Sequence, residues 1–451
     1  MNKTLIESDQ ELYKIICNEE QRQKNSIELI ASENYTSIGV MECLGSLLTN
    51  KYSEGQPGRR YYGGNQEIDK IELLCKKRAL ECYKLSNEDW HVNVQPYSGT
   101  PANLSVYNAL LNPHDRIMGL DLPSGGHLSH GYYNSKKKIS ATSVYYESLP
   151  YNIGEDGYIN FEELETLALK FRPKILICGG SAYPRDNDYK KFREIADKIE
   201  AILFCDMAHI SGLVAAGVLN NPFDYCDVVS TTTHKTLRGP RSGMIFIRNK
   251  NNWPELLDNS VFPGLQGGPH NHQIAGVAHQ LKNAMDPEFK SYISQVVSNA
   301  KTLCLELQRR GYKISTEGTD THIVLVDLKN KNISGSKLEK LCELVDISLN
   351  KNTVYGDKNP LYPSGVRIGT SAMTTRGFGT NEFTQIANYI DILVELCIEI
   401  QEKHGKTLKQ FNIGLDSDIE IQEKLNKLKL EINKMAQKYS FYNERIKHYK
   451  Y

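Results

Sequence analysis

The sequence predicts an α/β protein in which a mainly parallel β-sheet is covered by helices on both faces. Continuous apolar runs of strand length occur in four places: 174–178, 201–205, 226–230 and 243–247. Helical patterns at 161–171 and 189–199 separate the earlier runs. Strands that are apolar throughout and alternate with helices are typical of parallel sheets buried on both faces. Polar residues follow three of the runs, at Ser181, Asp206 and Lys235, where such sheets carry their chemistry.

The composition is that of a globular chain without a charge bias. At 451 residues the chain is long enough for two or three domains with a sizeable core. Its hydrophobic share of 40% and charged share of 24% are ordinary for soluble proteins. Because 54 basic residues balance 54 acidic ones, neither nucleic acid nor a membrane surface is expected as the main partner.

Cysteine usage and the first residues predict a cytoplasmic protein. The ten cysteines include no CxxC pair and no Cys/His cluster at metal-ligand spacing, so neither a disulfide framework nor a metal site is expected. The start lacks an apolar signal core, and Glu7 and Asp9 argue against a mitochondrial transit peptide. No apolar run approaches the ~20 residues that a membrane-spanning helix needs.

The functional prediction depends on the segment 228–241, VVSTTTHKTLRGPR. A strand-like run ends in hydroxyl residues, and a His-Lys pair and a Gly-Pro turn follow. Lysine is costly to bury unless its charge is paired or chemically consumed. A Schiff base with an aldehyde cofactor consumes the amine, and the neighbouring hydroxyls and imidazole suit a phosphate group. A His-Lys pair alone would favour an ordinary loop lysine.

The whole segment closely resembles the cofactor-lysine motif of serine hydroxymethyltransferases, which use pyridoxal 5'-phosphate (PLP). Further motifs extend the resemblance from about residue 28 to about residue 411. It implies the aminotransferase-like PLP fold (fold type I), with a mainly parallel seven-stranded sheet in a large domain, a smaller C-terminal α/β domain and an N-terminal helical arm. The expected boundaries are 1–35 for the arm, 36–286 for the large PLP-binding domain and 287–451 for the small domain with a final helix and tail.

The resemblance, closest to the eukaryotic cytosolic type, also implies an activity. Such a transferase of one-carbon metabolism interconverts L-serine and tetrahydrofolate with glycine and 5,10-methylenetetrahydrofolate. PLP is then bound covalently to Lys235, and tetrahydrofolate is the co-substrate. The family further implies a homodimer with shared active sites, and whether dimers pair into tetramers stays open.

A phosphate site is predicted at 93–101, NVQPYSGTP, where an extended piece turns into a helix expected at 101–111. The amides and hydroxyls of Ser98, Gly99 and Thr100 then lie at the positive end of the helix dipole. Many helices begin in this way, and the resemblance supplies the specificity. Family members usually have serine at position 100 and rarely proline at 101, so the placement of the Thr100 hydroxyl stays open.

Asp206 ends an apolar run and is a candidate helix cap, since His209 follows three residues later. It is also what a pyridinium ring needs, because a carboxylate partner keeps the ring nitrogen protonated. The string FCDMAHISGLVAAG at 204–217 matches the family, which favours the second role. By resemblance, His127 stacks on the ring, although it could simply cap a turn. Ser181 and His209 would address the phenolic oxygen and the substrate carboxylate region.

Arg367, in PSGVRIG, is the predicted anchor of the substrate carboxylate. A guanidinium binds a carboxylate through two parallel hydrogen bonds, with a structural salt bridge as the alternative role. By resemblance, Ser32 also touches the amino-acid substrate. Three further residues would shape the site around the lysine: Thr232, His234 and Arg241. Ser371 and Tyr355 stand where the family usually has proline, which is expected to change loop stiffness more than chemistry.

The loop 50–64, NKYSEGQPGRRYYGG, is rich in tyrosine and arginine for a connector. By resemblance, four of its residues reach into the neighbouring subunit's active site: Tyr52, Glu54, Tyr61 and Tyr62. Glu54 is the predicted general acid/base between the serine hydroxyl and folate, and Tyr62 would assist at the hydroxymethyl end. A second glycine loop at 261–269, VFPGLQGGP, would place Gly268 at the phosphate of the partner's cofactor.

The folate pocket is implied by the resemblance alone. Its predicted residues come from a loop after the strand at 116–120, from the tyrosine loop and from the small domain: Leu122, Gly126, Leu128, Glu54, Tyr61 and Asn352. They favour a serine hydroxymethyltransferase over a PLP-dependent threonine or serine aldolase, which needs no folate. A catalytically silent scaffold or an RNA-binding paralogue is the other alternative. Intact Lys235, Asp206 and Arg367, together with zero net charge, argue against it.

Amphipathic patterns predict helices at both ends of the chain. The charged pattern at 9–28 predicts an arm that lies on another subunit or domain. Apolar residues at helical spacing predict a final helix at 418–438. From about residue 440 the end, including RIKHYKY, is expected to be a solvated tail, with contact to an acidic partner as the alternative.

Overall fold

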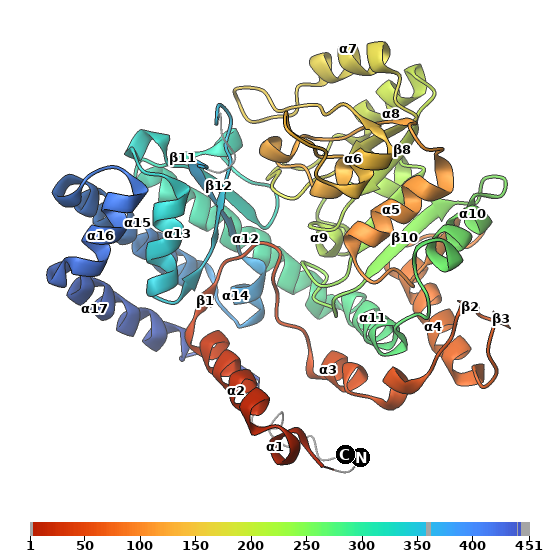
Figure 1. Ribbon diagram of the computed structural model, residues 1–451, viewed down its shortest axis with the longest axis horizontal. Helices are drawn as coiled ribbons and strands as arrows, with labels where there is room; N and C mark the ends of the chain where they lie inside the picture. The colour runs from red at the N-terminus through yellow and green to blue at the C-terminus, as the bar shows by residue number, and fades with distance from the viewer. Residues whose placement is uncertain (1–2, 358–361, 440, 443–451) are drawn as a thin grey trace.

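A seven-stranded sheet organises the larger of two lobes (Figure 1) in a computed structural model that describes residues 3–357, 362–439 and 441–442. Across the sheet the strands are β4 (Trp90–Asn93), β10 (Gly243–Arg248), β9 (Val228–Thr232), β8 (Ile202–Asp206), β7 (Ile175–Cys178), β5 (Arg116–Met118) and β6 (Glu147–Ser148). Neighbouring strands run parallel except in the two pairs that β10 makes. The prediction of a mainly parallel seven-stranded sheet is confirmed.

Burial on both faces explains why the strands are continuous apolar runs. Along β7, Ile175 and Ile177 pack into one core cluster, whereas Leu176 and Cys178 pack into another on the opposite face. The antiparallel direction of β10 was not predicted. It follows from the short connection 233–242, which carries Lys235, because a parallel neighbour would need a longer crossover.

Helices cover both faces of this sheet (Figure 1). In the large lobe they are α3 (Ile38–Leu44), α4 (Gln66–Cys82), α5 (Gly99–Leu110), α6 (Ala141–Tyr145), α7 (Phe161–Phe171), α8 (Tyr189–Lys198), α9 (Ser211–Ala215), α10 (Trp253–Asn259) and α11 (Asn271–Ala284). A small hairpin, β2 (Gly55–Gln56) with β3 (Arg59–Arg60), projects beside α4. The predicted helices at 161–171 and 189–199 are confirmed, and the helix expected at 101–111 begins two residues earlier, at Gly99.

The smaller lobe is built on a four-stranded antiparallel sheet with its own core. Its strands, in order across the sheet, are β11 (Lys313–Ile314), β12 (Ile323–Asp327), β15 (Gly365–Gly369) and β14 (Asn350–Asn352). Its helices are α13 (Gly335–Leu344), α14 (Ser371–Thr375), α15 (Thr380–His404), α16 (Leu408–Ser417) and α17 (Ile419–Ala436). Among the described residues, none of the helices combines the length and the apolarity needed to cross a membrane.

Helix α12 (Pro287–Arg309) joins the two lobes. Phe289 and Ile293, in its first half, pack in the large-lobe core, whereas Leu303 and Leu307 pack in the small-lobe core. The predicted boundary between residues 286 and 287 therefore falls at the start of a helix that both lobes share. The domain boundaries stay a prediction.

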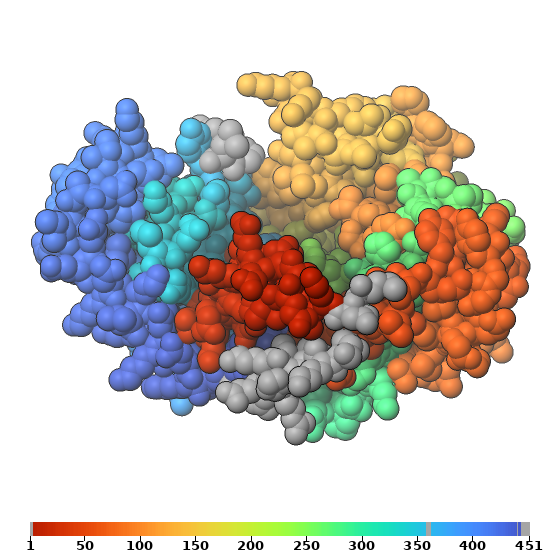
Figure 2. Space-filling model, turned by 60° about the horizontal axis from the view of Figure 1, so that its bottom comes forward, coloured from red at the N-terminus to blue at the C-terminus, as the bar shows by residue number. Residues whose placement is uncertain are grey.

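The N-terminal arm consists of α1 (Leu5–Ser8) and α2 (Gln10–Asn25), neither of which buries a residue. The predicted helix was too long, because Ile27 and Glu28 form strand β1, which pairs with β13 (Ile347–Ser348) in the small lobe. Ile27 and Leu29 are fully buried in the small-lobe core, so packing there overrides helical continuation. Figure 2 shows the arm, in red, on the surface of the molecule.

The predicted final helix is confirmed as α17, but the start of the tail is not solvated. Tyr442 Oη donates a hydrogen bond to the Thr36 carbonyl at 2.7 Å. The Phe441 ring meets the Tyr35 ring edge-on, with 5.4 Å between centroids. RIKHYKY lies outside the described residues, as does the rest of the tail beyond Tyr442.

Arg376 joins the two ends of the chain, and its removal should destabilise the fold. The buried guanidinium donates to four carbonyls at the C-terminal ends of α2 and α17, those of Gln23, Lys24, Ser26 and Ala436. Carbonyls at a helix end lack partners within the helix, so Arg376→Leu leaves them unpaired. We expect the free energy of unfolding to fall by roughly 3 kcal/mol in a chemical denaturation experiment.

The matched control for this prediction is Arg309→Leu. The Arg309 side chain is 73% exposed and, among the described residues, pairs only with Glu306. Such surface ion pairs contribute little, so the control should stay within about 0.5 kcal/mol of the unchanged protein. Equal losses in the two variants would contradict the role assigned to Arg376.

Candidate active site

A cavity of about 330 Å³ lies at the carboxyl ends of the parallel strands, between elements of both lobes. It collects the predicted cofactor and substrate residues that one chain was expected to supply: Ser32, Ser98, Gly99, Thr100, His127, Ser181, Asp206, His209, Thr232, His234, Lys235, Arg241 and Arg367. Gly180 and Ala208, which were not predicted, complete the lining. These residues span 336 positions of sequence from Ser32 to Arg367, so the fold brings them together.

Lys235 lies in the turn after β9 and is 9% exposed. Its Nζ donates to Thr232 Oγ1 at 3.2 Å. Burial, together with the positive charges of Arg367 and Arg241, lowers the pKa of Lys235 to about 8, although the Asp206 carboxylate opposes this. A buried amine with a lowered pKa is neutral in a sizeable fraction of molecules near neutral pH, which is the form that attacks an aldehyde.

Asp206, the last residue of β8, holds a buried negative charge. Its Oδ2 accepts hydrogen bonds from Asn103 Nδ2 at 2.8 Å and from His130 Nε2 at 3.0 Å, and its Oδ1 accepts one from the Ala208 amide at 3.0 Å. Burial alone would raise the pKa of Asp206, but the His130 hydrogen bond and nearby positive charges hold it well below the ordinary value. The carboxylate is therefore ionised, as the partner of a pyridinium nitrogen must be.

His127 presents a neutral imidazole to the cavity. Its Nδ1 accepts a hydrogen bond from the Ser129 amide at 3.2 Å and lies 2.7 Å from Ser129 Oγ. Because Nδ1 is an acceptor, the neutral ring carries its proton on Nε2. Burial lowers the pKa of His127 to about 4, against the opposing charge of Asp206. An uncharged, oriented ring suits stacking on an aromatic cofactor.

The N-terminus of α5 forms an anion-binding end of the cavity. Ser98 is the N-cap residue, and its side chain makes no capping hydrogen bond. A side chain at Gly99 would come within 2.8 Å of the Thr232 methyl group, so glycine permits close approach to the backbone. The first amides of this helix are free to bind a phosphate. Burial and the charges of Lys235 and Arg241 lower the pKa of nearby His234 to about 3.

Arg367 enters from the small lobe, on β15. Its Nη1 donates to the Ser181 carbonyl at 2.8 Å and its Nε to Asn350 Oδ1 at 3.1 Å. Among the residues that the structure describes, Nη2 has no hydrogen-bond partner. Burial lowers the pKa of Arg367 to about 10, so the guanidinium remains charged at neutral pH. It is not engaged in a salt bridge with any described residue, which leaves its charge for a ligand carboxylate.

His209 lies beside Arg367 and stacks on a histidine that was not predicted. The His209 and His322 rings are 5.7 Å apart with planes inclined by 17°. His322 Nε2 donates to the Ala31 carbonyl at 3.1 Å, next to Ser32 in the lining. Burial and the charges of Lys235 and Arg367 hold the pKa of His209 well below its ordinary value. His322 thus joins the small lobe, the N-terminal segment and the large lobe at the edge of the cavity.

The tyrosine loop does not reach the cavity of its own chain. Tyr52, Glu54, Tyr61, Tyr62 and Gly268 are absent from its lining. The three tyrosines are exposed, and Tyr61, at 71%, packs edge-on against Phe262. Gly267 and Gly268 lie against Glu54 and Tyr52, so the two glycine-containing loops form one surface.

The predicted folate residues lie in three separate segments: Leu122, Gly126 and Leu128 in the loop that carries His127, Asn352 at the end of β14, and Glu54 and Tyr61 in the tyrosine loop. Leu122 and His127 line one small adjoining hollow. Gly126 packs so closely that a side chain there would collide with the Leu120 carbonyl. Asn352 precedes Thr353, whose Oγ1 donates to the Pro123 carbonyl at 2.9 Å, so the small lobe touches the loop that contains Leu122 and Leu128.

Three residues with clear contacts were missed from the sequence: Asn103, His130 and His322. His130 follows His127 by three positions in the same loop, and Asn103 lies one helical turn after Gly99, so spacing from predicted residues was the available signal. The interpretation of Ser371 as a loop residue is wrong. It begins helix α14 and is buried, a first-turn position that proline also favours. Tyr355 does lie in a turn, as expected.

Comparisons with known proteins agree with this geometry. The family model described as "Serine hydroxymethyltransferase" matches residues 5–390. Serine hydroxymethyltransferase 4 of Arabidopsis thaliana is 56% identical, over 97% of this chain and 95% of its own. The cytosolic serine hydroxymethyltransferase of Oryctolagus cuniculus is 52% identical, over 96% and 93%. The chloroplastic serine hydroxymethyltransferase 3 of Arabidopsis thaliana is 51% identical, over 96% and 84%.

The family model matches most of the chain, and these three relatives are at least 51% identical to it. The cavity contains the residues that the resemblance predicted for one chain. The fold agrees as well, since the family has PLP fold type I and the chain forms a large, mainly parallel sheet with a second lobe. The chain belongs to the serine hydroxymethyltransferase family.

Proposed function

We propose that this enzyme interconverts L-serine and tetrahydrofolate with glycine and 5,10-methylenetetrahydrofolate, with PLP covalently bound to Lys235. The observation that carries the proposal is one cavity that holds a buried amine of lowered pKa, an ionised carboxylate and an unpaired guanidinium. A silent scaffold would not need these charges desolvated together. The relatives are named serine hydroxymethyltransferases rather than aldolases, which favours the folate-dependent reaction.

The residues of the cavity fit PLP. The N-terminus of α5, with Ser98 and Gly99, suits the phosphate. Asp206 is ionised, as a ring-nitrogen partner must be, and Lys235 supplies an amine for the aldehyde. His127 offers a neutral ring beside both. When bound, PLP supplies an electron-accepting ring that makes bonds to the amino acid's Cα breakable.

The small lobe supplies the substrate carboxylate site. The Arg367 guanidinium would bind a carboxylate as a fork, and its bond to the Ser181 carbonyl holds the guanidinium plane in place. Ser32 and His209 lie in the same lining and would complete the contact. Because these side chains come from both lobes and the N-terminal segment, binding of the amino acid stabilises the lobes in one relative position.

The proton transfers need a group that the chain's own cavity lacks. Within one chain, the ionisable groups of the lining are Lys235, Asp206, Arg241, Arg367 and histidines. Asp206 and Arg367 hold their charges, and burial keeps the lining histidines neutral. We assign the general acid/base role to Glu54, and the assisting role to Tyr62, from the neighbouring subunit. Glu54 would move a proton between the serine hydroxyl and folate.

A homodimer with shared active sites is part of this proposal, and the exposed surfaces support it. The tyrosine loop and the loop with Gly268 lie together, outside their own cavity, with large aromatic groups exposed. The arm adds exposed apolar side chains at Leu12, Ile15 and Ile16. Exposed apolar groups of this kind mark protein contacts. A two-fold dimer would bring each tyrosine loop to the partner's cavity, with the arm lying on the partner.

The cytoplasm is the proposed location. Relatives of comparable identity are named cytosolic in an animal and chloroplastic in a plant. A second relative named cytosolic, from Candida albicans, is 52% identical and supports this proposal.

The first test is turnover. Purified enzyme should show a visible absorbance from bound PLP and should convert serine to glycine only when tetrahydrofolate is supplied. Lys235→Ala should still fold and should lose turnover by about 100-fold or more, because no amine remains to exchange the cofactor with substrate. Folate-independent cleavage of serine at the same rate would identify an aldolase, and near-normal turnover of Lys235→Ala would remove Lys235 from catalysis.

A pH prediction follows from the lowered pKa of Lys235. The neutral amine attacks the PLP aldehyde, and its fraction rises as the pH passes through the pKa. We expect the rate of PLP uptake by cofactor-free enzyme to increase with pH, with a midpoint near the Lys235 pKa of about 8. Stopped-flow absorbance would measure it. A midpoint near the ordinary lysine value of about 10.4 would show that burial does not depress this group.

The shared site can be tested by mixing two inactive variants, Lys235→Ala and Glu54→Gln. When the unfolded chains reassemble at random, half of the dimers are mixed. If Glu54 serves the partner's site, each mixed dimer has one intact site, so about a quarter of all sites recover. The matched control pairs Lys235→Ala with Asp206→Ala, two residues of one cavity, and should recover nothing. Failure of the first mixture, with exchange verified, would place Glu54 in its own chain's site.

A further inference from the structure

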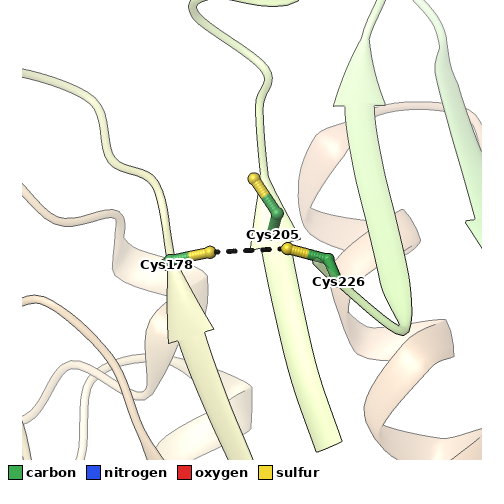
Figure 3. Close-up of side chains that lie close together, drawn as sticks. All are labelled: Cys178, Cys205 and Cys226. Atoms are coloured by element: carbon green, nitrogen blue, oxygen red, sulfur yellow. Dashed lines mark hydrogen bonds between the residues drawn. The ribbon is translucent and has the colours of Figure 1, made fainter. Parts of the chain in front are cut away.

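Three cysteines far apart in the sequence form a buried thiol cluster. The sulfur atoms of Cys178, Cys205 and Cys226 all lie within 4.8 Å of one another, and those of Cys178 and Cys226 are 4.0 Å apart. Their exposed fractions are 0%, 0% and 1%. Figure 3 shows Cys178 and Cys205 on adjacent strands of the large sheet and Cys226 on a neighbouring loop, with the Cys178 and Cys226 side chains pointing toward each other. The cluster is separate from the lining of the active-site cavity.

Sheet register creates the cluster. Cys178 ends β7, and its partner in the parallel register is Cys205 on β8. Both side chains therefore point to the same face of the sheet. Cys226 lies on the turn before β9, where its amide donates to the Pro222 carbonyl at 2.9 Å, and its side chain packs in the same core cluster.

We propose that Cys178, Cys205 and Cys226 form a binding site for one trivalent soft ion, with arsenic(III) as the representative. Thiolates are the ligands that soft ions prefer. An ion at the centre of a triangle with sides of 4.0–4.8 Å would lie about 2.3–2.8 Å from each sulfur. This range begins at the length of a zinc–sulfur bond, about 2.3 Å. Only small movements of the sulfurs are needed to bond all three to one ion.

The number of ligands argues against zinc. A structural zinc site has four ligands, and among the described residues no histidine, aspartate or glutamate joins the three thiols. The polar group next to them is Tyr189, whose Oη lies 3.9 Å from Cys205 Sγ. Burial raises the pKa of Tyr189 well above its ordinary value, so the phenol stays neutral and is a poor ligand. A three-coordinate ion fits the donors that are present.

Charge selects a trivalent ion. The three thiols lie in an apolar core, and the nearby ionic groups, Asp206 and Asp227, are acidic. Three thiolates around a monovalent or divalent ion would leave a net negative charge in an apolar core, which is costly. Three thiolates around a trivalent ion are neutral.

The chemistry of binding is balanced without an oxidant. Arsenous acid, As(OH)₃, exchanges its three As–O bonds for three As–S bonds. Each thiol proton leaves with one hydroxide as water, so three waters are released and arsenic stays trivalent. Cys226 also contributes to the wall of a separate cavity of about 640 Å³ beside Arg193 and Lys250, and because the three cysteines are buried, arsenite would enter through a local opening on that side.

Arsenic bound to the three cysteines would affect the active site through the strand ends that carry Asp206. Cys205 directly precedes Asp206, and Cys178 precedes Gly179, where an added side chain would lie 2.1 Å from the Asp206 carbonyl. These strand ends are packed without spare room. Because bonding draws the three sulfurs together, we expect arsenic to displace Asp206 and to reduce turnover without competing with serine.

The test is binding of sodium arsenite to the full-length, PLP-loaded protein under native conditions. Arsenic per chain is measured by mass spectrometry of the intact protein. The number of thiols that arsenic protects from alkylation is counted after denaturation in the continued presence of arsenite. The control is a sample that meets arsenite only after denaturation. We expect one arsenic and three protected thiols per chain in the native sample. Cys226→Ala should weaken binding by about 100-fold, because the third thiol acts at high effective concentration. Cys304→Ala removes a buried cysteine outside the cluster and is the matched control.

Several outcomes would overturn the proposal: no binding to the native protein, binding that survives Cys226→Ala, or an equal loss in Cys304→Ala. If Cys226→Ala fails to fold, as judged by its uptake of PLP, the variant Cys226→Ser is used in its place, because serine is close to cysteine in size. The arsenic count is independent of turnover, so the result does not depend on the proposed function.

Discussion

The buried Asp206 carboxylate is the charge on which the arrangement of the active site depends. It accepts hydrogen bonds from Asn103 on α5, from His130 in the loop after β5 and from the amide of Ala208, two residues further along the chain. Asn103 also accepts a bond from Ser230 on β9, at 2.6 Å. A charged acceptor strengthens each bond, and its loss would leave several buried donors unpaired. One carboxylate thus fixes the helix that offers the anion site and the loop that carries His127.

The cavity around Asp206 contains more positively charged side chains than this one carboxylate can neutralise. Lys235, Arg241 and Arg367 share a cavity with a single carboxylate. The pKa values of Lys235 and Arg367 are lowered because burial disfavours the charged forms of both groups. A phosphate at one end and a carboxylate at the other would offset this penalty. The site therefore favours a dianionic cofactor and an amino acid together, and burial makes the lysine reactive.

The proposed acid/base residue Glu54 lies outside the cavity of its own chain. Glu54 and the tyrosines beside it are held by a short hairpin whose buried Arg60 pairs with Asp69 and Glu72. This is a built structure rather than a loose connector, yet it ends outside its own cavity. In the proposed two-fold dimer, symmetry would bring this same surface to both cavities.

The sequence by itself determined the central strands of the sheet, through their apolar runs, and most of the cavity lining, through motifs such as those around Asp206 and Lys235 that resemble the serine hydroxymethyltransferase family. It misplaced Ile27 and Glu28, since an amphipathic pattern continued where burial against β13 decided otherwise. The reversal of β10, the support of Asp206 by His130 and Asn103, and the meeting of Cys178, Cys205 and Cys226 were decided only by the tertiary structure. Each depends on which strands are neighbours and in what register, and no spacing along the chain records that.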